Sequence, residues 1–268
     1  MRRTRVKGIV FLGGGRITSA LVAGLRLAGY RKRVIVHDRH PAKLRRLRKQ
    51  HAIIEEPDLH RAVAQADLLI IAVRPGSVLE LLREIGEVKR PLLAVSLAAG
   101  APIAKLRAKL GSPVQWARAM PSPACRSGRG LTAITFDTKF PVPGRRRLRS
   151  LFAQVGSVLE IPESKFDAFT VTYSCSHGYH ALEALAEAAA KLGLDRNAAF
   201  TAAAHALADG IVSWREGNVS LKNLLHEAAT PGGIAATVMD AMNAGGYTRA
   251  VERGLRAGLA RARANAKG

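Results

Sequence analysis

The stretch VFLGGGRITSALVAGLRLAGY, residues 10–30, joins an apolar run to a helical pattern through three successive glycines. Gly13 and Gly15 stand in the spacing G-x-G-x-x-T, where Thr18 replaces the usual Gly or Ala and is expected to crowd the packing of helix on strand. The first glycine permits a tight turn, the second lets backbone approach a pyrophosphate, and the helix start offers free N–H groups. Inside a strand–turn–helix–strand unit this pattern predicts a dinucleotide site, with a plain glycine-rich turn as the alternative. The predicted cofactor-binding residues also include the first helical residues, Arg16 and Ile17.

Short apolar runs alternate with helical patterns up to about residue 161. The runs expected to be extended cover residues 7–12, 33–38, 51–54, 67–73, 91–98 and 113–120. Such alternation predicts an α/β domain with a doubly wound, mostly parallel sheet of the Rossmann type. From Ser164 onward the sequence is rich in Ala and Leu and almost entirely helical in pattern. We therefore predict a dinucleotide-binding domain over residues 1–161 and an all-α domain over residues 162–268.

The second predicted strand ends at Asp38 and Arg39, where an adenosine ribose would lie. An acid here hydrogen-bonds the 2′-hydroxyl of NAD, whereas an arginine pairs with the 2′-phosphate of NADP or stacks on adenine. A surface ion pair between the two residues is the simpler alternative, so the sequence leaves the cofactor open. In open α/β sheets the ligand lies beyond the carboxyl ends of the strands, which adds candidates from two later loops. These are Val73, Arg74, Pro75, Ser96 and Ala98.

The composition points to a folded protein with an unusual charge. The chain has 268 residues, 48% of them hydrophobic, with 42 Lys and Arg against 20 Asp and Glu, a formal net charge of +22. The basic residues are spread out and aromatic residues make up only 5%, so a solvated surface is favoured and no nucleic-acid partner is expected. Two cysteines are too few for a disulfide framework. Neither the apolar run before the glycines nor residues 68–73 suits a signal peptide or a membrane span, so we expect a cytoplasmic protein that does not enter a membrane.

Several phrases resemble one family, the Δ1-pyrroline-5-carboxylate reductases. FLGGGRITSALVAGL (11–25) resembles the family's FIGGGNMAEALIAGL, and IAVRPG (71–76) resembles LAVKPQ. RAMPSPACRSGRGLTAI (118–134) and ATPGG (229–233) are similar to further family motifs in the same order. The resemblance covers nearly the whole chain.

This resemblance implies NAD(P)H-dependent reduction of a cyclic imino acid, above all Δ1-pyrroline-5-carboxylate to L-proline. It favours NADP slightly over NAD. It also implies that the helical half forms a homodimer or a higher homo-oligomer. The residues support that point independently, because so many Ala and Leu would expose apolar surface without a partner.

The departures from the family lie in the expected substrate site. YSCSHGY (173–179) stands where the family has SGSGPAY, and Ala235 replaces the threonine that supplies a hydroxyl. The residues that the resemblance places near the substrate are Ser174, Cys175, Ser176, Thr230, Gly232 and Gly233. His177 and Tyr179 are candidate catalytic residues that would donate a proton or bind an extra polar group; capping the helix is the alternative.

Two further functions remain open from the sequence alone. A diverged paralogue would reduce another cyclic imine or an oxo acid, as Ala235 and the altered YSCSHGY segment suggest. A non-catalytic nucleotide-binding protein would keep the fold and use the basic charge. Cys175, His177 and His180 lack a persuasive fourth ligand, so no metal site is predicted.

Overall fold

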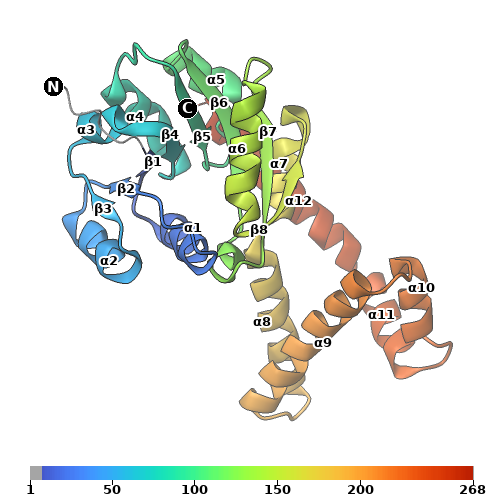
Figure 1. Ribbon diagram of the computed structural model, residues 1–268. Helices are drawn as coiled ribbons and strands as arrows, with labels where there is room; N and C mark the ends of the chain where they lie inside the picture. Colours follow the sequence, from blue (N-terminus) through green and yellow to red (C-terminus); the bar gives the residue numbers. More distant parts are fainter. Residues whose placement is uncertain (1–7, 268) are drawn as a thin grey trace. The chain divides into compact units, whose positions relative to one another are not determined.

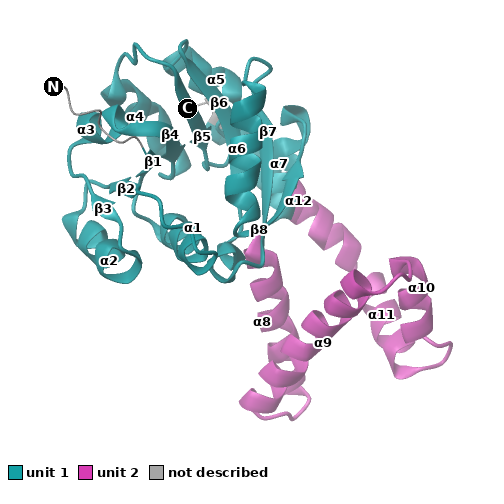
Figure 2. Cartoon of the chain, in the orientation of Figure 1, with its two compact units in different colours: residues 1–173, 258–268 teal, residues 174–257 magenta. Residues whose placement is uncertain are grey.

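The computed structural model describes residues 8–267 (Figure 1). Lys7 of the predicted strand 7–12 and the basic residues before it lie outside the described residues. Contacts divide the chain into two compact units, residues 1–173 with 258–268, and residues 174–257 (Figure 2). The sequence predicts a domain boundary after residue 161. This division into compact units does not test that boundary, which remains a prediction.

The first unit contains a sheet of eight strands in the order β3-β2-β1-β4-β5-β6-β7-β8. The strands are β1 (Gly8–Leu12), β2 (Val34–His37), β3 (Ile54–Glu55), β4 (Ala66–Ile71), β5 (Leu92–Ser96), β6 (Val114–Pro121), β7 (Gly130–Phe136) and β8 (Gly156–Glu160). All neighbours pair in parallel except β6 and β7, which are antiparallel. The predicted doubly wound, mostly parallel sheet is confirmed.

Helices cover both faces of the sheet because each strand sends alternate side chains to opposite sides. Along β1, Ile9 and Phe11 join one apolar cluster, while Val10 and Leu12 join the other. The first cluster includes residues of α1 (Arg16–Leu27), α2 (Pro41–His51) and α6 (Val142–Ala153). The second includes residues of α3 (Leu59–Ala64), α4 (Val78–Ile85) and α5 (Ile103–Lys109). Two short 3₁₀ turns, η1 (Pro75–Ser77) and η2 (Pro123–Ser127), follow β4 and β6, and α7 (Glu163–Thr172) follows β8.

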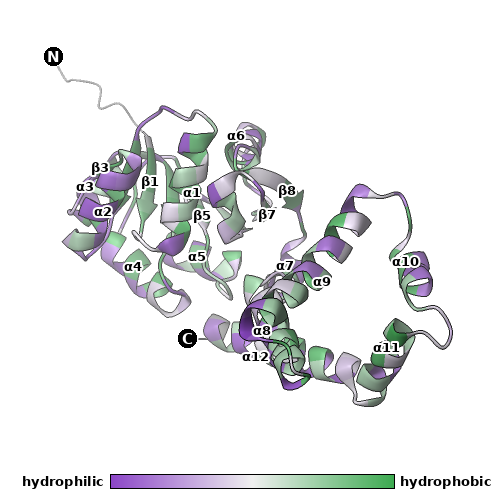
Figure 3. Ribbon diagram, turned by 90° about the horizontal axis from the view of Figure 1, so that it is seen from below, coloured by the Kyte–Doolittle hydropathy of each residue, from purple (hydrophilic) through white to green (hydrophobic). Residues whose placement is uncertain are grey.

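The second unit is helical and has little core of its own. It contains α8 (Cys175–Lys191), α9 (Arg196–Glu216), α10 (Leu221–Ala228), α11 (Ile234–Ala244) and the first part of α12 (Tyr247–Lys267). Its buried apolar cluster consists of Ala186, Ala199 and Ala203, between α8 and α9. Large apolar side chains are exposed instead, as the hydrophobic colouring of α11 in Figure 3 illustrates. Among the described residues, no helix is both long and apolar enough to cross a membrane.

Candidate functional site

The glycine loop after β1 is held in a conformation that requires glycine. Gly13 has a φ of +111°, and a Cβ there would lie 2.5 Å from the carbonyl oxygen of Ala72. Its N–H donates to the carbonyl of His37 at 2.7 Å, which ties the loop to the end of β2. Thr18, the residue expected to crowd the packing, is fully buried, and its hydroxyl donates to the carbonyl of Gly13 at 2.6 Å. The threonine therefore closes the turn.

The start of α1 is free to receive an anion. Gly15 precedes the helix, and no side chain caps its first N–H groups. A Cβ at Gly15 would meet no atom of the protein within 4 Å, so the fold itself does not require glycine there. A bare backbone beside open space, at a positive helix end, fits a bound pyrophosphate.

Asp38 follows β2 and is fixed against this loop. The N–H of Gly14 donates to its Oδ2 at 2.7 Å, and the N–H of His40 donates to its Oδ1 at 2.9 Å. Lys43 Nζ lies 3.3 Å from Oδ2. Burial on its own would raise the pKa of Asp38, but these two hydrogen bonds and the Lys43 ammonium outweigh it and lower the pKa. The carboxylate is therefore charged at neutral pH.

Arg39 turns to a different partner. Its guanidinium lies 2.7 Å from the carboxylate of Glu84 on α4. This hydrogen bond and the negative charge of Glu84 raise the pKa of Arg39. The sequence alternative of an ion pair between Asp38 and Arg39 is wrong, because each has its own partner.

A cavity of about 580 Å³ joins these features at the carboxyl ends of β1, β2 and β4. It brings together seven of the predicted cofactor residues: Gly13, Gly15, Arg16, Asp38, Arg39, Val73 and Arg74. It does not include Ile17, Pro75, Ser96 or Ala98. Ser96 ends β5, and both Ser96 and Ala98 are buried. The N–H of Ala98 donates to Ser96 Oγ at 3.3 Å.

Sequence reasoning missed several residues that line the cavity, among them His40, Lys43, Ser77 and Leu81. Lys43 carries a usable signal, since it stands in the first turn of the helix that follows the Asp38 loop. Ser77 and Leu81 lie in the segment after Pro75. The loop motif that ends at Pro75 and Gly76 does not predict that this segment turns back toward the cavity.

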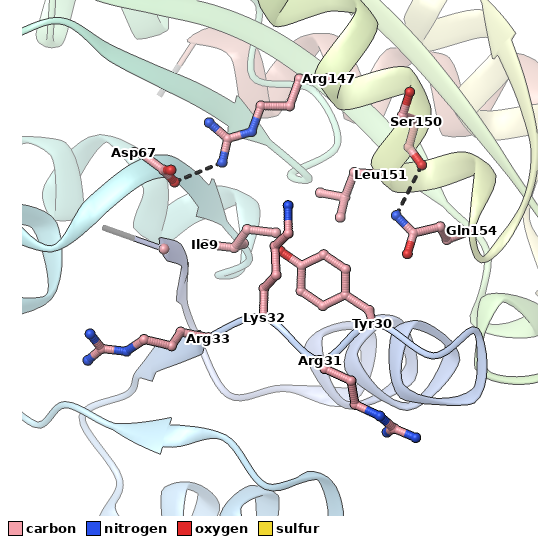
Figure 4. Close-up of a pocket in the computed structure, with 11 residues that line it drawn as sticks. Ile9, Tyr30, Arg31, Lys32, Arg33, Asp67, Arg147, Ser150, Leu151 and Gln154 are labelled. Atoms are coloured by element: carbon pink, nitrogen blue, oxygen red, sulfur yellow. Dashed lines mark hydrogen bonds and ion pairs between the residues drawn. The ribbon is translucent and has the colours of Figure 1, made fainter. Parts of the chain in front are cut away.

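A second cavity, of about 640 Å³, lies at the opposite edge of the sheet, where β1 and β4 begin (Figure 4). Arg147 of α6 pairs with Asp67 across it at 2.8 Å. Lys32 points into this cavity, whereas Arg31 and Arg33 point away from it. None of the predicted site residues lines this cavity. Four basic residues do, and they form part of the basic surface: Arg31, Lys32, Arg33 and Arg147.

In the second unit, the predicted substrate residues lie at two helix starts. Ser174 precedes α8; its Oγ lies 2.6 Å from Ser176 Oγ, and its carbonyl accepts from the N–H of His177 at 3.0 Å. Cys175 is a half-buried free thiol. Tyr179, but not His177, lines a surface hollow of about 430 Å³ with His180, Glu183 and Phe200.

The start of α11 has the second set. Gly232 has a φ of +76°, and the N–H of Gly233 donates to the carbonyl of Thr230 at 2.9 Å. The hydroxyl of Thr237 donates to the carbonyl of Gly233 at 3.1 Å, so it is engaged by its own helix. No described side chain caps the N–H groups at this helix start, which fits a carboxylate.

The fold and the cavity define a dinucleotide-binding protein of the Rossmann class with a helical C-terminal part. Residues 163–265 match the family model described as pyrroline-5-carboxylate reductase dimerisation. Residues 8–100 match the one described as NADP oxidoreductase, coenzyme F420-dependent. The pyrroline-5-carboxylate reductase of Thermus thermophilus is 31% identical over 260 residues, covering 93% of this chain and 97% of that protein. The chain belongs to the pyrroline-5-carboxylate reductase family.

Other relatives agree with this assignment. The pyrroline-5-carboxylate reductase of Corynebacterium melassecola is 28% identical over 256 residues, 93% of this chain and 95% of that protein. The crystal structure of the Plasmodium falciparum pyrroline carboxylate reductase with NADP bound has a TM-score of 0.86 at 20% identity, covering 98% of this chain and 99% of that one. At that identity the structural likeness establishes the fold alone. The resemblance inferred from the motifs is confirmed.

Proposed function

We propose that this chain catalyses the NAD(P)H-dependent reduction of Δ1-pyrroline-5-carboxylate to L-proline. One observation carries the proposal: the dinucleotide cavity at the first strand–helix turn belongs to a chain that matches a pyrroline-5-carboxylate reductase over 93% of its length. The reaction reduces a carbon–nitrogen double bond, which requires a hydride, a held substrate and a proton on nitrogen.

The residues of the cavity suit the cofactor. A bound nicotinamide dinucleotide supplies the hydride. The N–H groups at the start of α1 would hold its pyrophosphate, and Asp38 would face the adenosine ribose. The net positive lining of the cavity, with Arg16 and Arg74 beside the glycine loop, favours an anionic ligand.

The helical unit supplies the candidate substrate groups. The N–H groups at the start of α11, after Gly232 and Gly233, suit the carboxylate of the imino acid. A protonated iminium already carries the proton that the product nitrogen needs, so reduction requires no strong acid. His177 and Tyr179 would then bind or orient the substrate instead of delivering a proton.

The test is oxidation of NADH and of NADPH, followed at the nicotinamide absorbance, with and without added pyrroline-5-carboxylate. Turnover that depends on this substrate supports the proposal. Tight cofactor binding without turnover would contradict it and favour the diverged paralogue, for which Ala235 and the Tyr179 hollow are the specific motives. A panel of other cyclic imines would follow.

Gly15→Val tests the glycine loop. A Cβ at this position points into open space, so we expect the fold to remain intact while the side chain fills the space that a pyrophosphate needs. We expect the KM for the cofactor to rise at least about tenfold, a loss of about 1.4 kcal/mol in binding. An unchanged KM in a variant with an unchanged melting temperature would remove the glycine loop from cofactor binding.

We also propose that the chain works as a homo-oligomer, assembled through its helical unit. The dimerisation family match over residues 163–265 and the exposed apolar side chains of this unit support the proposal.

A further inference from the structure

We propose that Asp38 makes this chain prefer NADH, by denying the end of β2 to the 2′-phosphate of NADPH. The inference rests on the proposed function only in assuming that the cavity binds a nicotinamide dinucleotide. It concerns the choice between two cofactors that differ in one phosphate, and the sequence alone leaves that choice open because Asp38 and Arg39 favour opposite answers.

The first step is the position of Asp38. It directly follows β2 and lines the same cavity as Gly13 and Gly15. In this fold an acidic residue at that place accepts hydrogen bonds from the ribose hydroxyls, whose 2′-oxygen carries the phosphate in NADPH. The substituent that distinguishes the cofactors is therefore expected beside this carboxylate.

The second step is that the carboxylate cannot turn away. Both of its oxygens accept backbone hydrogen bonds, from Gly14 at 2.7 Å and from His40 at 2.9 Å. Only 9% of the side chain is exposed. Each carboxylate oxygen has a second lone pair, which Lys43 Nζ approaches only at 3.4 and 3.3 Å. A ribose hydroxyl would take the place of one of these long contacts and leave both backbone hydrogen bonds intact.

The third step is charge. Asp38 stays ionised because its hydrogen bonds lower its pKa. A 2′-phosphate placed against it would bring two anions together and would offer no proton for the carboxylate to accept. The ammonium of Lys43 lies 3.3 Å from Asp38 and already forms an ion pair with it. Lys43 is therefore less able to neutralise a 2′-phosphate.

Arg39, the residue that would favour the 2′-phosphate, is engaged elsewhere. Arg39 is paired with Glu84 of α4 at 2.7 Å. The other arginines of the cavity belong to different strands: Arg16 begins α1 after β1, and Arg74 follows β4, which lies on the far side of β1 from β2. Neither of them follows β2, where the 2′-position is expected.

Direct binding tests the proposal without any substrate. Dissociation constants of NADH and NADPH are measured by fluorescence titration of the intact chain at fixed moderate salt. We expect NADH to bind at least about tenfold more tightly, a difference of about 1.4 kcal/mol. Equal affinities, or tighter binding of NADPH, would overturn the proposal whether or not the protein reduces pyrroline-5-carboxylate. Conversely, preferred binding of NADH without turnover of pyrroline-5-carboxylate would contradict the proposed function and support the cofactor preference.

Two variants separate the two halves of the argument. Asp38→Asn removes the negative charge but keeps an oxygen for the N–H of Gly14, and should tighten NADPH binding about tenfold. Glu84→Gln releases Arg39 without touching Asp38 and should tighten NADPH binding severalfold while leaving NADH binding unchanged. Melting temperatures of both variants exclude a folding defect. If Asp38→Asn does not improve NADPH binding, Asp38 is not the determinant and the proposal is wrong, whatever Glu84→Gln does.

Discussion

The side chain of His51, at the end of α2, makes the stability of the protein depend on pH. Its Nε2 lies 3.1 Å from the hydroxyl of Ser19, which also accepts a hydrogen bond from Arg126. Burial, followed by the positive charges of Arg126 and Arg26, lowers the pKa of His51 below its usual value of 6.5. The folded protein therefore binds fewer protons here than the unfolded chain once the pH falls below about 6.5.

The sign of the effect follows from that difference. His51 costs the folded state nothing above pH 7, and the free energy of unfolding decreases as the pH falls through the unfolded pKa. We expect lower stability at pH 5.5 than at pH 7.5 in urea titrations, with a smaller difference in His51→Gln. An identical pH difference in wild type and variant would show that His51 is not responsible. Asp38 and Asp137, whose pKa values are lowered, titrate well below this window.

The same scale shows where sequence reasoning ended at the cofactor site. Gly13 and Gly15 could be assigned, because the tight turn requires Gly13 and a pyrophosphate requires bare backbone at Gly15, and the local spacing indicates both. Asp38 and Arg39 could not be resolved, because the answer depends on Glu84, whose carboxylate comes from α4. A contact between residues that distant in the chain leaves no mark in a local pattern.

At the scale of elements, Arg118 joins β6 to α7. Only 1% of its side chain is exposed; its guanidinium lies 3.0 Å from Glu163 and 2.6 Å from Asp167, over the ring of Phe166. Glu163 also accepts the N–H of Ile103 at the start of α5, so one ionic cluster connects three elements. The sheet and α7 therefore depend on this buried charge.

Arg118→Met should be strongly destabilising. It leaves two carboxylates without their cation. Breaking a fully buried ion pair costs about 3–5 kcal/mol, and we expect a loss of about 2–3 kcal/mol here because Glu163 and Asp167 are 34% and 23% exposed and water can solvate them. Adding Glu163→Gln and Asp167→Asn to Arg118→Met should recover part of the loss, because the unpaired charges are gone. Urea denaturation of the single and triple variants measures both. If the single variant loses less than about 1 kcal/mol, the cluster contributes little to stability.

The last strands show why part of the sheet escaped prediction. The alternation of strand and helix identified β1, β2, β4, β5 and β6, since each parallel strand needs a crossover. The expected run 51–54 overlaps β3 only at Ile54, because α2 continues to His51. β6 instead turns back through η2 into β7, the one antiparallel pairing of the described sheet. A Cβ at Gly156 would collide with the carbonyl of Gly130, so β7 and β8 meet through two bare backbones. Gly130 and Gly156 each begin their strand, and glycine is a weak strand signal, which explains why these two strands were not predicted.

On the scale of the whole molecule, the two units bury very different amounts of apolar surface. The sheet has an extensive apolar cluster on each face, whereas the helical unit has three buried alanines. Along α11, Ile234, Val238 and Met242 stand at helical spacing and are 86%, 52% and 46% exposed. Water-facing side chains of this size on one helix face are typical of an interface.

Val238→Asp tests whether that face holds the proposed oligomer together. A charge in the middle of an apolar contact must lose its hydration without gaining a partner, so we expect dissociation to monomers, measured by light scattering coupled to size exclusion. Val142→Asp is the matched control, because Val142 is also an exposed valine on a helix but belongs to α6 of the first unit, and it should leave the molar mass unchanged. If Val238→Asp keeps the wild-type mass, the α11 face is not the interface. If both variants dissociate, the added negative charge and not the α11 contact is responsible. Dissociation of Val238→Asp alone would assign the exposed face of Ile234, Val238 and Met242 to the interface.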